Sequence, residues 1–358
     1  MVTNLAGGLV DAGFDVDLVL AKARGEHLAA IPSRVRIIRL GSRHTLTSLP
    51  PLIRYLRQQQ PDALLAAKDR AIKVAVIARR LAGTSPRLTG RLGTTVSAAL
   101  EESSWLKKQF WYAGMRLFYL GVDQIVAVSE GVANDVKTIT GLPNERVQVV
   151  RNPVITPHLT ELSLAETPHP WLLDNRVPVI LAAGRLTRQK DFPTLLRAFA
   201  LLHSSRPCRL IILGEGADHH PLETLAEQLR ITEDFALPGF STNPYAWIGR
   251  ASLFVLSSAW EGSPNVLTEA LALGIPSVAT DCPSGPREIL QQGRYGKLVP
   301  VGDVSALAQA MEQTLENPLP KQILQQAVED YTVSTSVQGY LNALGLTADN
   351  SQHNDAAL

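Results

Sequence analysis

The sequence is poor in the residues that build disulfide frameworks and membrane spans. Its only cysteines, Cys208 and Cys282, are too few and too far apart for a disulfide framework, which favours a reducing compartment. No apolar run reaches the ~18–20 residues that a membrane-spanning helix needs. The first residues lack the basic start and apolar stretch of a secretory signal. We therefore expect a cytoplasmic protein.

Signatures of metal-dependent or nucleophilic catalysis are missing as well. The eight histidines show no ligand spacing, and the adjacent pair His219 and His220 cannot share one helical face. Asp15 and Asp17 look like the acidic pair of a metal site, but no third ligand accompanies them and they flank the start of a strand. Neither cysteine sits in a glycine-rich elbow. The sequence predicts no metal and no cofactor.

Charge is divided unevenly along the chain, although the net charge is only +1. Residues 1–160 carry 21 Lys and Arg against 12 Asp and Glu, whereas the remainder carries 13 against 21. A basic half indicates an anionic partner, such as a membrane surface or a lipid-linked phosphate, unless it is only a solvated face. We favour a peripheral position on the inner face of the cytoplasmic membrane. Nucleic acid is disfavoured because no zinc finger, recognition helix or stacking-aromatic pattern accompanies the charge.

Short apolar strands alternate with amphipathic helices twice over, and 358 residues suffice for two domains. Near-continuous apolar strands between helices predict parallel sheets covered on both faces. The fold class is therefore α/β, with two Rossmann-like, doubly wound parallel-sheet domains. The expected strands are Val16–Leu20, Val35–Leu40, Ala63–Ala67, Arg87–Arg91, Gln124–Val128, Val147–Val150, Val179–Ala183, Arg209–Leu213, Phe235–Leu237, Leu253–Ser257, Ser277–Thr280 and Lys297–Val299.

Proline-rich sequence without periodicity, between Thr156 and Arg176, marks the domain boundary. The chain opens directly on a helix, so the first strand of the N-terminal domain is expected to be missing, through truncation or an unusual sheet. The predicted parts are a first Rossmann-like domain at 1–160, a second Rossmann-like domain at 161–330, a helix crossing back to the first domain at 331–345 and a disordered tail at 346–358.

The most informative segment is Ser257–Leu271, in which Glu261 and Glu269 bracket a turn that starts a helix. Ser263 is predicted to be the N-cap and Pro264 the first helical residue. The N–H groups of the next three residues should then point outward and bind phosphate. The residues of this predicted anion site are Gly262, Ser263, Pro264, Asn265, Val266 and Leu267.

Three other loops follow strands, at the sheet edge where ligands bind in α/β domains. Gly184-Arg185-Leu and Lys190 offer two cations that can hold a diphosphate, although either alone would be an ordinary surface charge. Gly214-Glu215-Gly gives a tight turn but not a dinucleotide fingerprint. Leu237-Pro-Gly239-Phe240 places an aromatic ring and a free backbone edge near a nucleobase, unless Phe240 is simply core.

Together these motifs closely resemble glycosyltransferase family 4, retaining enzymes of the GT-B fold that include bacterial polysaccharide and lipopolysaccharide transferases. The resemblance runs from Met1 to about Leu344. The matching segments are Glu261–Ala270, Gly184–Leu186, Lys190–Phe192, Gly214–Gly216, Ala127–Gly131 and Arg151–Val154.

The resemblance implies two domains facing a cleft, with the acceptor bound by residues 1–160 and the nucleotide-sugar donor by residues 161–330. It also implies a role for each matching residue. Arg185 and Lys190 would bind the donor diphosphate, and Glu269 the ribose hydroxyls. Glu261 would contact hydroxyls of the donor sugar, and residues around Gly239 and Phe240 would face the base. Two features depart from the family: its opening strand with a glycine-rich loop has no counterpart, and Arg91–Ser97 lacks a histidine that many members carry.

The expected reaction moves a sugar from a nucleoside diphosphate sugar, with UDP favoured, to an acceptor hydroxyl on a glycan or lipid-linked glycan. The anomeric configuration is expected to be retained. An enzyme resembling a UDP-GlcNAc 2-epimerase is one alternative, and it would act without an acceptor. A non-catalytic protein that binds sugar nucleotides or glycans is the other.

Overall fold

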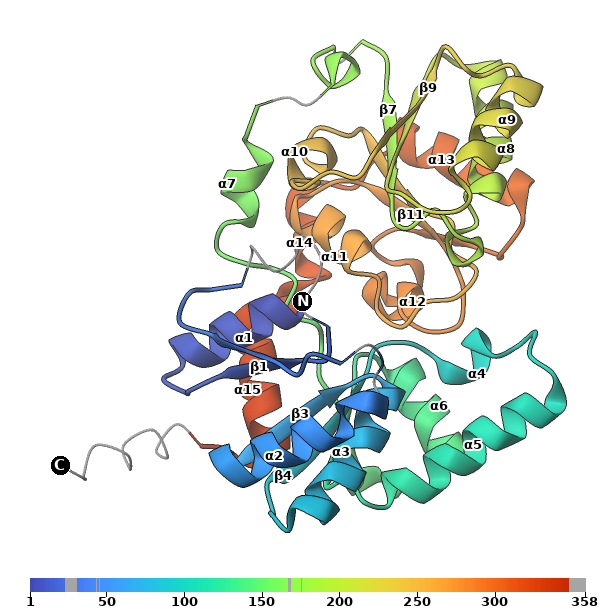
Figure 1. The fold of residues 1–358 in the computed structure, drawn as a ribbon. Coiled ribbons are helices and arrows are strands. Elements are labelled where there is room, and N and C mark those ends of the chain that lie inside the picture. The colour runs from blue at the N-terminus through green and yellow to red at the C-terminus, as the bar shows by residue number, and fades with distance from the viewer. Residues whose placement is uncertain (23–30, 43, 45, 167–168, 175, 348–358) are drawn as a thin grey trace. The chain divides into compact units, whose positions relative to one another are not determined.

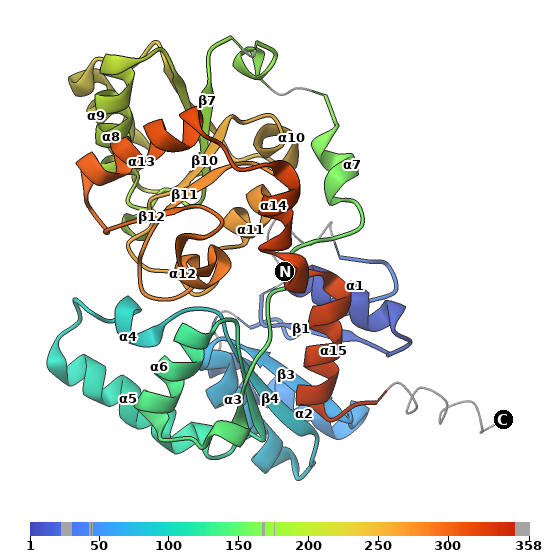
Figure 2. The same ribbon diagram turned by 180° about the vertical axis from the view of Figure 1, so that it is seen from behind.

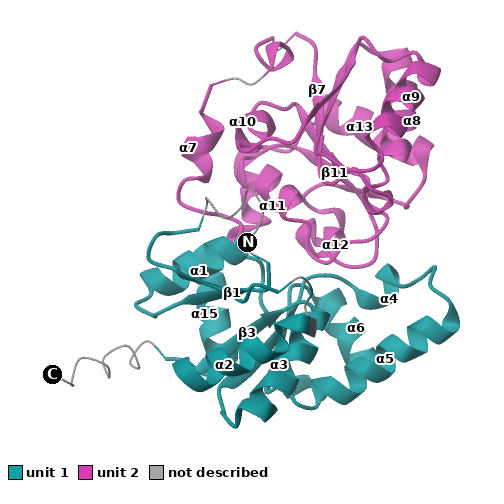
Figure 3. Cartoon of the chain, in the orientation of Figure 1, with its two compact units in different colours: residues 1–153, 332–358 teal, residues 154–331 magenta. Residues whose placement is uncertain are grey.

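The computed structural model describes residues 1–22, 31–42, 44, 46–166, 169–174 and 176–347. The chain divides into two compact units, coloured separately in Figure 3. Unit 1 comprises residues 1–153 and 332–358, and unit 2 comprises residues 154–331. The predicted disordered tail lies outside the described residues from position 348 onward. Each unit is an α/β domain.

Unit 2 is built on a sheet of six parallel strands (Figure 1). Their order across the sheet is β12-β11-β10-β7-β8-β9, so strands are added to one side after β7 and to the other side from β10 onward. Every residue of β7 is buried, as expected for a strand covered on both faces. The strands are β7 (Val179–Ala183), β8 (Arg209–Leu213), β9 (Phe235–Gly239), β10 (Leu253–Leu256), β11 (Ser277–Thr280) and β12 (Lys297–Val299).

Helices cover both faces of this sheet and form two separate hydrophobic clusters. Side chains of α10, α11, α12 and α14 fill one cluster, and side chains of α8, α9 and α13 fill the other. The helices of unit 2 are α7 (Leu159–Ser163), α8 (Phe192–Ser205), α9 (His219–Leu229), α10 (Tyr245–Ile248), α11 (Asn265–Ala272), α12 (Pro286–Ile289), α13 (Val304–Glu316) and α14 (Lys321–Gln326).

Unit 1 has its strands in two sheets that are not paired with one another in the described residues. β1 (Asp17–Leu20) pairs with β2 (Arg36–Arg39), and four further parallel strands follow in chain order. Val19 and Leu64 pack into one cluster with α2 and α3, so both sheets contribute to the same layer. The other strands are β3 (Ala63–Ala67), β4 (Arg87–Leu92), β5 (Gln124–Ala127) and β6 (Val147–Val149).

The helices of unit 1 also cover two faces. Side chains of α1 and α15 share one cluster, and those of α3, α5 and α6 share another on the opposite side of the four-stranded sheet. The helices are α1 (Val2–Asp11), α2 (Leu49–Gln59), α3 (Asp69–Ala82), α4 (Val96–Ala99), α5 (Trp105–Tyr119), α6 (Glu130–Thr140) and α15 (Val333–Leu344).

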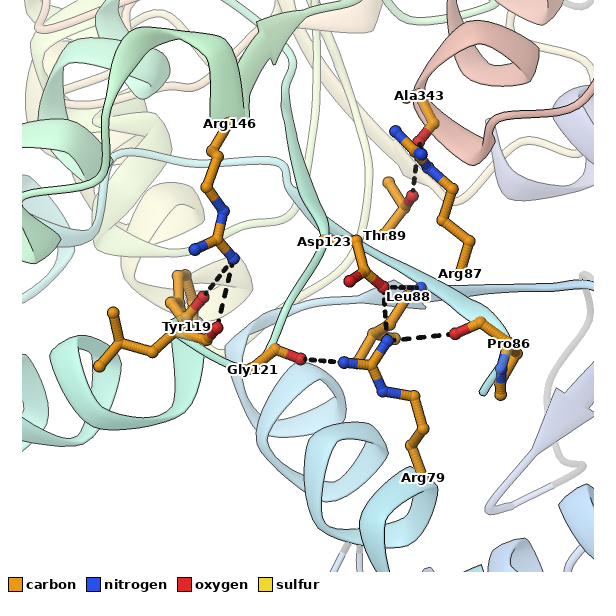
Figure 4. Close-up of polar contacts among 11 residues, drawn as sticks. Arg79, Pro86, Arg87, Leu88, Thr89, Tyr119, Gly121, Asp123, Arg146 and Ala343 are labelled. Carbon is orange, nitrogen blue, oxygen red and sulfur yellow. Dashed lines mark hydrogen bonds and ion pairs between the residues drawn. The ribbon is translucent and has the colours of Figure 1, made fainter. Parts of the chain in front are cut away.

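The last helix, α15, returns to unit 1 after the chain has completed unit 2 (Figure 2). Its Tyr340 is fully buried, and the tyrosine hydroxyl accepts a hydrogen bond from Nε of Arg91 at 2.9 Å. The side chains of Arg87 and Thr89 each donate to the carbonyl of Ala343 at 3.0 Å (Figure 4). Apolar burial and these polar contacts attach the helix to β4.

Arginine side chains fix the turn that follows α5, as Figure 4 shows. Nη2 of Arg146 donates to the carbonyl of Tyr119 at 3.3 Å, at the end of the helix. Nη2 of Arg79 donates to the carbonyl of Gly121 at 2.7 Å, and Nη1 of Arg79 pairs with Asp123. Cations beside the last carbonyls of a helix also interact favourably with its dipole.

Candidate functional site

The candidate site lies in unit 2, where the order of the strands reverses. β7 and β10 are neighbours, and the chain leaves them toward opposite sides of the sheet. Ligands of open α/β sheets bind at the carboxyl ends of the strands at such a point. The loop after β7 contains Arg185 and Lys190, and the loop after β10 contains Glu261. The topology thus brings together loops about 70 residues apart in sequence.

Lys190 and Glu261 form an ion pair between these two loops. Nζ of Lys190 lies 2.6 Å from Oε1 of Glu261, and their side chains are only 15% and 9% exposed. Oγ of Ser258 donates to the same carboxylate oxygen at 2.8 Å. The sequence motifs pointed to phosphate for Lys190 and to sugar hydroxyls for Glu261, but they did not predict that the two residues pair. Glu261 therefore also orients the cation.

Three further hydrogen bonds join the same loops. The backbone N–H of Ala259 donates to the carbonyl of Gln189 at 2.8 Å, and Nε2 of Gln189 donates to the carbonyl of Trp260 at 3.0 Å. Oγ of Ser257 donates to the carbonyl of Lys190 at 2.7 Å. Because each loop satisfies polar groups of the other, the ion pair is held on a fixed frame.

Arg185 lies on the same edge but in a different environment. Its side chain is exposed, and no hydrogen bond or ion pair is found for it among the described residues. The preceding glycine leaves space for Lys190, since a Cβ at Gly184 would lie 2.8 Å from Cε of the lysine. The site therefore combines one cation fixed by a carboxylate with one that is available to an anion.

Glycines bring three strand ends into close contact beside these cations. A Cβ at Gly214 would lie 1.9 Å from the carbonyl oxygen of Gly184, and the φ of Gly214 is +141°. The N–H of Gly214 donates to the carbonyl of Gly239 at 2.8 Å. Glu215 is exposed on this edge. Only glycine at position 214 allows the ends of β7 and β8 to approach this closely.

The segment assigned to the nucleobase lies at the end of β9. Phe240 directly follows this strand and is 46% exposed. The side chain of Leu237 packs against the cluster of α8, α9 and α13, so only its backbone is left for a ligand. The ring of Phe240 is therefore not part of the core, which was the alternative interpretation of the sequence.

The start of α11 differs from the prediction. The helix begins at Asn265 with Pro264 as its N-cap, and no side chain caps it, so Ser263 is not the N-cap. Pro264 is extended, with ψ of 103°, and its carbonyl accepts the N–H of Leu267 at 3.2 Å. The N–H of Leu267 therefore does not point outward as expected, because the first turn closes on the proline carbonyl. The helix begins one residue later than predicted.

Glu269 has its own partner, away from the ion pair. It is half-buried, and its carboxylate is hydrogen-bonded by the hydroxyl of Tyr245 on α10. Burial raises the pKa of Glu269 to about 7, and the hydrogen bond from Tyr245 opposes this effect. No motif indicated Tyr245, because the contact depends on how α10 packs beside α11.

Three further residues near the ion pair were not predicted. Ser258 binds Glu261 directly, and Oγ1 of Thr280 donates to the carbonyl of Ser258 at 2.6 Å. Cys282 is buried close by, and burial, followed by the charge of Glu261, raises the pKa of its thiol to about 12. A thiol with this pKa stays protonated at neutral pH, so Cys282 is not a nucleophile.

Metal clusters and membrane-spanning helices are both absent from the described residues. These contain no group of three or more His, Cys, Asp or Glu side chains that could hold a metal ion. Asp17, of the acidic pair considered above, is engaged by Arg36 and by the hydroxyl of Tyr55. Within the same residues, none of the helices combines the length and apolar character needed to cross a bilayer.

Comparisons with known proteins identify the family of this chain. The profile described as "Glycosyltransferase Family 4" matches residues 1–157, and that of "Glycosyl transferases group 1" matches residues 165–331. The chain therefore belongs to glycosyltransferase family 4. A related protein of Campylobacter jejuni, an N-acetylgalactosaminyltransferase acting on a diphospho-undecaprenol-linked sugar, is 30% identical over 251 residues, which is 70% of this chain and 66% of that protein.

Solved structures show the same fold. Anabaena HepE in complex with UDP-glucose gives a TM-score of 0.76 at 18% identity, covering 96% of this chain and 94% of that one. The apo galactosyltransferase WaaB gives 0.71 at 19% identity over 96% and 94%. The two parallel-sheet units thus form a GT-B fold, as predicted. The chain aligns with less than two thirds of the length of these sequence relatives. The aligned region covers 66% of the Campylobacter protein, and 28% and 55% of two further relatives.

Proposed function

We propose that the protein transfers a sugar from a UDP-sugar to an acceptor hydroxyl on a glycan or lipid-linked glycan, with retention of configuration. The observation that carries the proposal is the convergence of Arg185, Lys190 and Glu261 where the sheet of unit 2 reverses its strand order. Family membership supports the reaction class. UDP is favoured because Anabaena HepE, a structural neighbour, was solved with UDP-glucose.

The difficult step is the departure of a diphosphate that gains negative charge as the glycosidic bond breaks. Arg185 and Lys190 would stabilise this charge, and Glu261 would keep Lys190 in position. Fixed donors directed at developing charge are often the largest contribution to catalysis, about 3–4 kcal/mol for one group. In this scheme the cations replace a divalent metal, and no cofactor takes part.

We propose retention of configuration on the basis of the same arrangement. No carboxylate of this edge is proposed as a nucleophile, because Glu261 is engaged by Lys190 and Ser258. We propose that the acceptor attacks on the face that the diphosphate leaves, and that the departing phosphate takes the acceptor proton. Glu269, when ionised, would accept hydrogen bonds from the ribose hydroxyls.

The proposed acceptor is lipid-linked because the Campylobacter relative is named for a diphospho-undecaprenol substrate. An acceptor of this kind lies in a bilayer, which suits a peripheral position at the cytoplasmic face of the membrane. Positive charge in residues 1–160 would attract an anionic surface of this kind.

Two measurements test the function. UDP-sugars should raise the melting temperature more than GDP- or ADP-sugars do, by mass action. With the best donor and a lipid-linked acceptor, Arg185→Ala should lower turnover by about a hundredfold or more. Arg197→Ala, which removes an exposed cation from α8, is the matched control and should leave turnover unchanged.

Several outcomes would contradict the proposal. Wild-type turnover in Arg185→Ala would exclude the assigned role of this residue. Conversion of the donor sugar without any acceptor would indicate an epimerase instead. Donor binding with neither transfer nor hydrolysis, across a panel of acceptors, would indicate a non-catalytic binding protein.

A further inference from the structure

Helix α5 of unit 1 presents large apolar side chains to solvent along one face. They recur every three or four residues, which is the spacing of one helical face. The outer stripe consists of Leu106 (72% exposed), Phe110 (83%), Ala113, Leu117 (68%) and Leu120 (68%), the last directly after the helix. Trp105, 69% exposed, begins the helix beside this stripe. An apolar patch of this kind marks an interaction site.

The stripe is not needed to hold the helix on the domain. The opposite face of α5 already packs into the core through Met115 and Tyr119, both fully buried. Trp111 lies between the faces, with Nζ of Lys73 5.0 Å from its ring centroid. The folding of unit 1 therefore uses one side of α5, and the stripe on the other side has no partner among the described residues.

Both ends of α5 are fixed, so the stripe is a rigid surface. Oγ of Ser104 caps the first turn by accepting the N–H of Lys107. At the other end, Arg146 donates to the carbonyls of Tyr119 and Leu120, and Arg79 donates to that of Gly121 (Figure 4). A partner would meet a preformed helix and would not have to order it first.

Charge on and around α5 selects the kind of partner. The helix carries Lys107, Lys108 and Arg116 and no carboxylate. At 100° per residue, Lys107 borders one side of the outer stripe, and Arg116 borders the other side together with Trp105. Nε of Arg116 also donates to the carbonyl of Ile139 at 2.7 Å. Cations beside an apolar stripe can keep their charges at the level of lipid headgroups while the stripe enters the acyl region.

Three carboxylates packed beside α5 are already engaged. Asp69 forms an ion pair with Lys73 at 2.9 Å and accepts a hydrogen bond from Tyr119. Asp123 is held by Arg79, and Asp135 accepts the N–H of Val96 at 2.7 Å. Glu101 and Glu102 lie exposed in the turn before the helix, so the positive charge of this region lies along α5 itself.

We propose that α5 lies in the interfacial plane of an anionic bilayer, with the outer stripe inserted among the acyl chains and its flanking cations beside anionic headgroups. This inference deepens the proposed function by naming the element through which unit 1 would reach a membrane-bound acceptor. It is tested without donor or acceptor, so vesicle binding and sugar transfer can fail independently of one another.

The experiment is co-sedimentation of the 358-residue chain with vesicles of phosphatidylcholine and phosphatidylglycerol, and with vesicles of phosphatidylcholine alone. Wild-type protein should bind the mixed vesicles, and binding should weaken with added salt. Phe110→Asp should lower the partition coefficient at least about tenfold, because the lost side chain would otherwise be buried in lipid. Lys107→Gln should lower it roughly fivefold, the usual effect of one cation near an anionic surface.

Leu201→Asp is the matched control, since this leucine is 50% exposed on α8 of unit 2 and should leave binding unchanged. A blue shift of tryptophan fluorescence on adding mixed vesicles, absent in Trp105→Phe, would report insertion at α5. Because Phe110 is exposed, Phe110→Asp should melt close to the wild-type temperature, which separates lost binding from unfolding.

Three results would overturn the proposal. Equal binding by Phe110→Asp and wild type would exclude the stripe as the contact. Equal binding to both kinds of vesicle would exclude anionic headgroups. Absence of binding to either kind of vesicle would also contradict the proposal. If wild-type protein then formed dimers in sedimentation equilibrium and Phe110→Asp did not, the stripe would instead be an interface between two copies of the chain.

Discussion

At the scale of residues, the ion pair of Lys190 and Glu261 serves both stability and the proposed chemistry. Two charges with little exposure lose hydration, and their mutual attraction compensates for this only because Ser258 and the loop backbones support the geometry. A diphosphate that approached Lys190 would compete with Glu261 for the ammonium group. Arg185, which has no such partner in the described residues, is therefore the cation expected to contact the donor first.

Glu269 gives a prediction about pH. Its pKa is raised to about 7 from an ordinary value of 4.5, mainly by burial. Between these two values the folded state holds a proton that the unfolded state has lost, so stability falls as the pH rises through this window. Glu269→Gln removes this dependence. The free energy of unfolding of wild type, relative to that of the variant, should fall by roughly 1–3 kcal/mol between pH 5 and pH 8.

Urea unfolding of both proteins across this range measures the difference directly, and other titrating groups cancel in the comparison. A difference that stays constant from pH 5 to pH 8 would show that the carboxyl group titrates normally. The same titration affects the proposed donor contact, since protonation turns one of the two acceptor oxygens into an O–H donor.

At the scale of elements, the glycines of the strand ends give a second prediction. Gly214→Ala would place a methyl group 1.9 Å from the carbonyl oxygen of Gly184, so the ends of β7 and β8 would have to separate. We expect a loss of about 2–4 kcal/mol in stability and a loss of donor binding. Gly83→Ala is the control, because this glycine also has a positive φ but a Cβ at this position would meet nothing within 4 Å.

The control should cost only about 1–2 kcal/mol, the usual penalty for a left-handed residue, and should leave donor binding unchanged. Thermal melts and UDP titration distinguish the two variants. If both lost the same stability, the close approach of the strands would not be the cause.

At the scale of the whole molecule, the division into units predicts how the chain can be cut. All residues of the two hydrophobic clusters that cover the six-stranded sheet belong to unit 2 itself. The two ends of the unit meet where the N–H groups of Val154 and Ile155 donate to the carbonyl of Tyr331. A fragment of residues 154–331 should therefore fold alone and bind UDP. A fragment of residues 1–153 should not fold cooperatively, because it lacks α15, whose Tyr340 fills a cluster of unit 1.

Circular dichroism melts and amide spectra of the two fragments test this, with the second fragment joined to residues 332–347 as the control. Cooperative folding of residues 1–153 by themselves would show that α15 only covers a domain that is stable without it. An unfolded 154–331 fragment would show that its two clusters are insufficient.

Much of the local structure could be predicted from the sequence. The strands Ala63–Ala67, Val179–Ala183 and Arg209–Leu213 begin and end where predicted, because an apolar run and the residues that interrupt it act over a few positions. The start of α11 could not be predicted, because the extended conformation of Pro264 depends on the loop that packs against it. This loop lies so close that a Cβ at Gly285 would be 2.7 Å from Cδ of Pro264. Packing of this loop therefore outweighs the local preference for Ser263 as the N-cap, and Pro264 takes that position.

The sequence by itself determined the class of fold, the strands with their following loops, and the residue types offered to a sugar nucleotide, since these depend on short-range patterns. Only the tertiary structure decided that Lys190 pairs with Glu261, that Tyr245 meets Glu269, and that one face of α5 is left outside the core. Each of these depends on which segments pack side by side. Strand order and helix packing fix those neighbours, and periodicity along a single segment carries no information about them.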